Sequence, residues 1–133
     1  ANQAILDMFE AGFATEAETS AEIKRVYDAC DYVEDPHTAV ASAVYQKYVE
    51  RTGDHTPTVI ASTASPYKFP RVAVEAVSRQ APADDFAAVK ELEKLSGVAI
   101  PKAVNGLETA EVRHKTVVAT SDMQKAVEDY LGL

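Results

Sequence analysis

The sequence is poor in the features that mark secreted and membrane-spanning proteins. It has one cysteine, Cys30, which cannot form a disulfide within the chain and suits a reducing compartment. No apolar run approaches membrane-spanning length, and the N-terminus lacks the basic and apolar regions of a signal peptide. We therefore expect a cytoplasmic protein with no membrane contact. Cys30 falls on the apolar side of an expected helix, which favours an inert core residue.

Basic residues are also scarce. The net charge is −8, and most of the excess acid lies in residues 1–35. Nucleic-acid binding depends on neutralising phosphates with Lys and Arg, so we expect no nucleic-acid partner. The acidic segment is typical of a solvated helix face.

Common catalytic and metal-binding motifs are missing as well. The chain has no Gly-x-Ser-x-Gly nucleophile motif and no Gly-x-x-x-x-Gly-Lys phosphate loop. Its three histidines, His37, His55 and His114, do not have the spacing of metal ligands, so we expect no metal site.

The hydrophobic pattern predicts helices that alternate with short strands. One helix should begin at Asp35-Pro36, because Asp caps free amides and Pro fits the first turn, and should stop before Gly53. Alternation of helices with strands favours parallel pairing. The expected fold class is therefore α/β, with a small, mainly parallel sheet of two or three strands flanked by helices. Further helices are expected over 19–30, 69–78, 86–95 and 121–131, and strands over 32–34, 58–61 and 116–119.

Two capping-box patterns, Thr19–Glu22 and Ser121–Gln124, are expected to start the first and last of these helices. We expect residues 1–133 to form one domain. The small sheet, together with a chain that begins at Ala1 instead of Met, suggests a fragment of a longer protein.

The most informative segment is Pro57–Pro70, where a buried strand is expected to run into a turn rich in hydroxyl groups. Open α/β sheets usually place ligands where a strand ends and a helix begins. The turn carries Ser62, Thr63, Ser65 and Lys68, and hydroxyls near a helix start can hold an anionic group.

Asp35 and His37 lie two residues apart at an expected helix start. A histidine beside a carboxylate can act as a general acid–base pair. The alternative is a helix cap followed by a surface or packing histidine. The residues alone leave both interpretations open.

These two segments together resemble the C-terminal part of threonine synthase. The first reads Asp-Pro-His-Thr-Ala-Val-Ala over Asp35–Ala41, and the second reads Ala-Ser-Thr-Ala-Ser-Pro-Tyr-Lys-Phe-Pro over Ala61–Pro70. The resemblance covers most of the chain, including the closing helix at Met123–Leu131. The chain departs from the family at Ser65, where many members have His.

The resemblance implies a pyridoxal-phosphate enzyme of the tryptophan-synthase-β-like fold, which converts O-phosphohomoserine and water to threonine and phosphate. In that family a lysine of the N-terminal half holds the cofactor beside a phosphate-binding loop, and this chain has neither. It would therefore be a C-terminal fragment, inactive alone, whose partner is the missing N-terminal part of the enzyme. Without that part, its exposed apolar surface could support a homodimer.

The resemblance also implies roles for residues of the turn. Thr63 matches the position whose hydroxyl faces the pyridine nitrogen, and Ser62 and Ala64 would shape the turn through their backbone. Asp35 and His37 would hold the turn in place without contacting the cofactor themselves. Ser65 and Lys68 would lie around it, Lys68 either near a phosphate or at the surface. No residue of this chain is expected to be catalytic by itself.

Two other functions are open. The chain could be a free-standing module whose Thr63 turn holds a small anion or metabolite. It could also be a small acid–base enzyme that uses Asp35 and His37.

Overall fold

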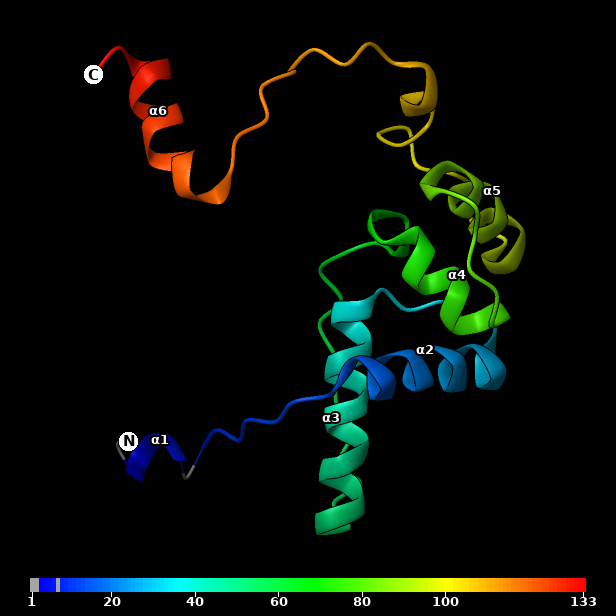
Figure 1. The fold of residues 1–133 in the computed structure, drawn as a ribbon. Helices are drawn as coiled ribbons and strands as arrows, with labels where there is room; N and C mark the ends of the chain where they lie inside the picture. Colours follow the sequence, from blue (N-terminus) through cyan, green and yellow to red (C-terminus); the bar gives the residue numbers. More distant parts are fainter. Residues whose placement is uncertain (1–2, 7) are drawn as a thin grey trace.

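The described part of the chain, residues 3–6 and 8–133, is helical or irregular in the computed structural model, with no β-strand (Figure 1). Six α-helices and three short 3₁₀-helices are found there. The elements in chain order are α1 (Gln3–Leu6), α2 (Glu16–Cys30), α3 (Pro36–Thr52), η1 (Pro66–Lys68), α4 (Pro70–Ser78), α5 (Asp85–Ser96), η2 (Leu107–Thr109), η3 (Thr120–Asp122) and α6 (Met123–Leu131).

The expected α/β fold with a small parallel sheet is therefore wrong. Residues 32–34, 58–61 and 116–119 are all irregular. A strand needs a neighbouring backbone, and residues 58–61 make no backbone hydrogen bond to any part of the chain that the structure describes. The segment is not buried either, since Val59 is 94% exposed. Its β-branched residues fit a pleated, half-buried surface, but no such surface forms around them.

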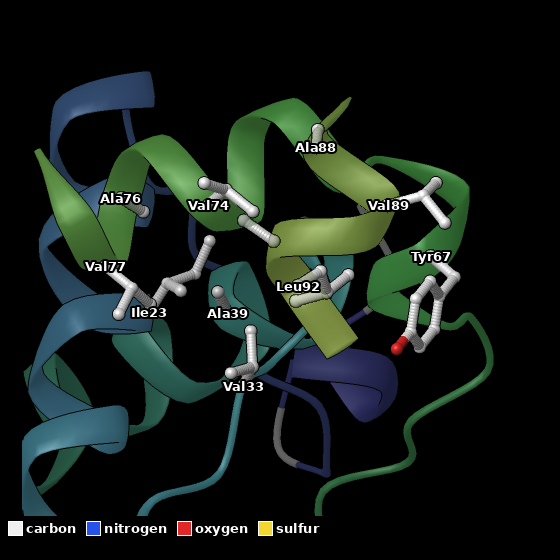
Figure 2. Packing of buried hydrophobic residues seen from close by; sticks show 11 residues of the cluster. Ile23, Val33, Ala39, Tyr67, Val74, Ala76, Val77, Ala88, Val89 and Leu92 are labelled. Atoms are coloured by element: carbon white, nitrogen blue, oxygen red, sulfur yellow. The ribbon is translucent and has the colours of Figure 1, made fainter. Parts of the chain in front are cut away.

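Helices α2, α3, α4 and α5 pack together, and α4 contacts both α2 and α5. Their inward side chains form one apolar cluster that includes Ile23, Val74 and Leu92, none of which is exposed (Figure 2). Small residues such as Ala39 and Ala73 are fully buried in it and let the helices approach closely. Tyr67 of η1, directly before α4, belongs to the same cluster, so the core holds the end of the segment that precedes α4.

Helix ends follow the capping chemistry of the sequence at several places. Asp35 caps α3 and Pro36 is its first residue, as expected. Gly53 ends α3 with a positive φ of 70°, a conformation that glycine adopts without steric cost. The predictions for α4 and α5 are also confirmed. Helical periodicity in residues 69–78 predicts that Ala73, Ala76 and Val77 face inward, and all three are buried.

Both predicted capping boxes are wrong. The box of α2 is formed one turn earlier by Thr15 and Glu18, which have the same spacing as Thr19 and Glu22. Thr19 instead donates its hydroxyl to the Thr15 carbonyl, 2.9 Å away. At the start of α6 no side chain of the described residues caps the helix.

Cys30 is exposed at the C-terminal end of α2, so its expected place in the core is also wrong. The buried face of this helix lies nearer its middle, at Glu22 and Ile23, where α3 and α4 pack. Cys30 lies beyond that contact.

Helix α6 lies apart from the four packed helices, at the end of a long irregular segment (Figure 1). Helical periodicity in residues 121–131 predicts that Met123, Val127 and Tyr130 face inward, but they are 58%, 57% and 90% exposed. Across the described residues, no helix combines the length and apolar character needed to cross a membrane.

Candidate functional site

The start of α3 is built around a buried carboxylate. Asp35 is only 1% exposed, and its Oδ1 accepts hydrogen bonds from the backbone amides of His37 at 2.9 Å and Thr38 at 3.3 Å. Burial by itself would raise the pKa of Asp35. The hydrogen bonds from Thr38 and from these amides outweigh burial, so the pKa lies below its usual value. Asp35 is therefore ionised at neutral pH.

The same carboxylate is connected to the hydroxyl-rich turn through Thr38. Asp35 Oδ2 lies within hydrogen-bonding distance of the Thr38 hydroxyl, and Thr38 Oγ1 lies 2.9 Å from Ser62 Oγ. Sequence reasoning did not include Thr38. Its position three residues after the capping Asp35 was the available signal, because that spacing brings the two side chains together at a helix start.

His37 contacts the far end of the turn. Its ring lies 5.0 Å from the ring of Phe69, centroid to centroid, and its Nδ1 lies 3.5 Å from Asp35 Oδ1. The His37 side chain is 68% exposed. Lys68 also turns toward Phe69, with its Nζ 5.5 Å from the ring centroid. The two sequence motifs are thus in contact at both Ser62 and Phe69.

Ser65 has a local structural task. Its Oγ accepts a hydrogen bond of 3.2 Å from the Tyr67 amide and so caps η1. Tyr67 is buried, and its hydroxyl donates to the Val98 carbonyl. Burial raises the pKa of Tyr67 above its usual value, so the phenol stays neutral. These contacts attach the second half of the turn to the segment after α5.

Thr63 differs from its neighbours. It is exposed, and its side chain makes no hydrogen bond to any residue within the described ranges. Its hydroxyl is therefore free to face a ligand. Ala64, the next residue, is half-buried.

Three of the residues expected to surround one ligand line two neighbouring hollows, which share Tyr67. Ala64 and Ser65 line a cavity of about 260 Å³ together with Tyr32. Lys68 lines a larger groove of about 690 Å³, between α4 and α5, whose walls include Phe86. The structure thus brings Asp35, His37 and Ser62 together, and it places Lys68 on the Phe69 ring that His37 also contacts.

A second buried carboxylate lies beside Asp35. Glu34 is 6% exposed, and its Oε2 has no hydrogen-bond partner among the described residues. Burial, and after it the charge of Glu22, raises the pKa of Glu34 to about 7. Glu22 itself accepts hydrogen bonds from Arg25 and from the Ser42 hydroxyl. The sequence carried no signal for this cluster, because Glu34 fell in an expected strand.

The described residues hold no group of three or more His, Cys, Asp or Glu side chains arranged to bind a metal ion. The arrangement is suited instead to presenting a turn. Asp35, Thr38 and Ser62 anchor it at one end, Tyr67 and Phe69 anchor it at the other, and Thr63 stands exposed between them.

Comparison with known proteins finds similarity over most of the chain. The sequence model of a family described as "Threonine synthase, C-terminal" matches residues 38–130, which include the whole turn. A mouse protein named threonine synthase-like 1 is 39% identical over 69 residues, which make up 52% of this chain. The matched segment spans 9% of the length of the mouse protein.

Proposed function

Since the chain belongs to the threonine synthase C-terminal family, we propose that it forms one wall of a pyridoxal-phosphate site in an enzyme that makes threonine. The proposed reaction converts O-phosphohomoserine and water to threonine and phosphate. The family match supports the general assignment. The free hydroxyl of Thr63, on a turn anchored at both ends, is the observation that supports the site.

The residues of the turn fit the nitrogen end of the cofactor ring. An unprotonated pyridine nitrogen accepts one hydrogen bond, and Thr63 offers a hydroxyl with no competing partner among the described residues. A hydroxyl carries no negative charge, so it would not stabilise a protonated ring nitrogen. When bound, the cofactor supplies an electron sink for the negative charge that develops on the substrate. A neutral ring makes that sink weaker, which suits elimination and replacement.

The rest of the catalytic machinery would come from outside this chain. Lys68 lies against Phe69 and lines the groove next to the hollow of Ala64 and Ser65, which fits a place beside the turn more than a hold on the cofactor ring. We propose that the chain alone is inactive and that its partner is the N-terminal part of the same enzyme. A cytoplasmic location is part of the same proposal.

Direct acid–base chemistry by Asp35 has less support. Three donors hold its carboxylate, and its pKa is lowered, so it is a poor proton acceptor at neutral pH. The contacts of Asp35 and His37 instead match a bracing role for the turn. The alternative of a free-standing module for a small anion or metabolite would place its ligand at the same turn.

The function is tested in the full-length protein loaded with pyridoxal phosphate. We expect Thr63→Val to lower phosphate release from O-phosphohomoserine at least tenfold, because one hydrogen bond to the ring is lost. Thr63→Ser keeps a hydroxyl and should stay within about threefold of the wild type. Equal rates for Thr63→Val and wild type would contradict the site, and absence of cofactor binding would contradict the function.

A further inference from the structure

The hydrogen bonds that join Asp35, Thr38 and Ser62 have a direction that follows from proton counting. An ionised carboxylate only accepts hydrogen bonds, so the Thr38 hydroxyl must donate its proton to Asp35 Oδ2. A hydroxyl has one proton. The 2.9 Å contact between Thr38 Oγ1 and Ser62 Oγ therefore requires Ser62 to donate and Thr38 to accept.

This direction makes the two neighbouring hydroxyls of the turn different. The proton of Ser62 is committed to Thr38, and its oxygen can only accept from a ligand. The hydroxyl of Thr63 has no partner within the described part of the chain, so its proton is free. Of this pair, Thr63 is the residue that can donate to an acceptor atom of a ligand.

We propose that Thr38 is a positioning residue that accepts the proton of Ser62, ties the turn to α3 and so leaves Thr63 as the donor of the pair. The proposal rests on the proposed function, because the acceptor atom it assigns to Thr63 is the unprotonated ring nitrogen of pyridoxal phosphate. The ionised Asp35 sets the direction of both hydrogen bonds, because its charge fixes the orientation of the Thr38 hydroxyl.

Thr38 can be altered without removing the cap of α3. Asp35 still accepts hydrogen bonds from the amides of His37 and Thr38 when the side chain at 38 has no hydroxyl. Thr38 is 6% exposed, and Val matches Thr in shape but not in hydrogen bonding, so Thr38→Val keeps the side-chain volume while removing the hydroxyl that donates to Asp35 Oδ2. Thr38→Ser is the matched control, because it keeps the hydroxyl and removes a methyl group.

The first measurement uses the cofactor-free, full-length protein. We expect Thr38→Val and Ser62→Ala each to raise backbone amide hydrogen exchange about tenfold at residues 67–69, whose amides donate hydrogen bonds to Ser65 and Pro66, because the turn opens more often once its tie to α3 is lost. Thr38→Ser should exchange within twofold of the wild type. Unchanged exchange in Thr38→Val, or equal increases in Thr38→Val and Thr38→Ser, would overturn the proposal.

The second measurement is the affinity of the same proteins for pyridoxal phosphate, which is monitored through the absorbance of the bound cofactor. We expect Thr38→Val to weaken binding about fivefold to tenfold, with no further loss when Ser62→Ala is added, because the two residues act through one hydrogen bond. Additive losses would overturn the proposal. If the wild type binds no cofactor, the proposed function fails, and the exchange measurement decides whether Thr38 anchors the turn.

Discussion

At the scale of single residues, the buried carboxylates of this chain behave in opposite ways. Asp35 has three hydrogen-bond donors and a lowered pKa, whereas Glu34, the preceding residue, has an unpartnered oxygen among the described residues and a pKa raised to about 7. Both are buried, at 1% and 6% exposure. The difference arises from the hydrogen bonds that Asp35 accepts and from the charge of Glu22 near Glu34, since burial alone disfavours the charged form of both.

The raised pKa of Glu34 should make the folded state less stable as the pH rises. Between the usual value of 4.5 and about 7, folded Glu34 binds more protons than unfolded Glu34, so the free energy of unfolding falls as pH increases. The loss is on the order of 3 kcal/mol across that interval. We expect Glu34→Gln to remove it, and so to stabilise the protein at pH 8 but hardly at pH 5.

Urea unfolding of this chain at several pH values between 5 and 8 measures the effect. Glu50→Gln is the control, because Glu50 is an exposed carboxylate on α3. If Glu34→Gln and the wild type lose stability with the same slope, Glu34 is not a buried acid that ionises in this range.

At the scale of elements, the two ends of α3 were the most predictable part of the structure. Asp35, Pro36 and Gly53 act through bonds to adjacent backbone groups, which need no other part of the fold. Strands could not be predicted in the same way. Residues 58–61 have strand-like composition, but a strand exists only if a second segment pairs with it, and within the described residues none does.

The start of α2 shows the limit of local patterns. Two segments, Thr15–Glu18 and Thr19–Glu22, have the same capping-box spacing, and the structure uses the first. In the second, Thr19 and Glu22 are buried against α3, where Glu22 accepts from Ser42. Packing selected the cap, because it placed the later pair inside the helix.

Removal of the observed cap should destabilise α2. We expect Thr15→Ala to lower the free energy of unfolding by about 1 kcal/mol, because the Glu18 amide loses its partner, while Thr15→Ser should have little effect. Chemical unfolding followed by circular dichroism measures both. A cap at Thr19 would instead leave Thr15→Ala as stable as the wild type.

The sequence predicted which residues belong to the candidate site better than it predicted the contacts between them. Sequence reasoning named Asp35, His37 and Ser62, and the structure brings these side chains to one place. It omitted Thr38, the residue that connects them. That connection joins α3 to a turn far along the chain, and no local pattern reports a contact of that kind.

At the scale of the whole molecule, many large apolar side chains are uncovered. Val59, in the irregular segment before η1, is 94% exposed, and Tyr130 of α6 is 90% exposed. Apolar exposure of this extent is typical of surfaces that another protein segment covers. The proposed N-terminal part of the enzyme would supply that cover in the full-length protein.

Without such cover, we expect this 133-residue chain to self-associate. Sedimentation velocity at increasing concentration should show a rising mass, because association buries apolar surface. Tyr130→Ser should weaken it, while Lys115→Ser, at another exposed position, should not. A constant monomer mass would contradict this expectation, as would equal behaviour of Tyr130→Ser and wild type.

The sequence by itself determined where α3, α4 and α5 begin and end and which family the chain belongs to, because caps, periodicity and short motifs act over a few neighbouring residues. Only the tertiary structure decided that the described residues form no sheet, that Glu34 is buried, and that Thr38 reaches Ser62. Those outcomes depend on which distant segments meet, and packing of the whole core selects among contacts that local chemistry allows equally.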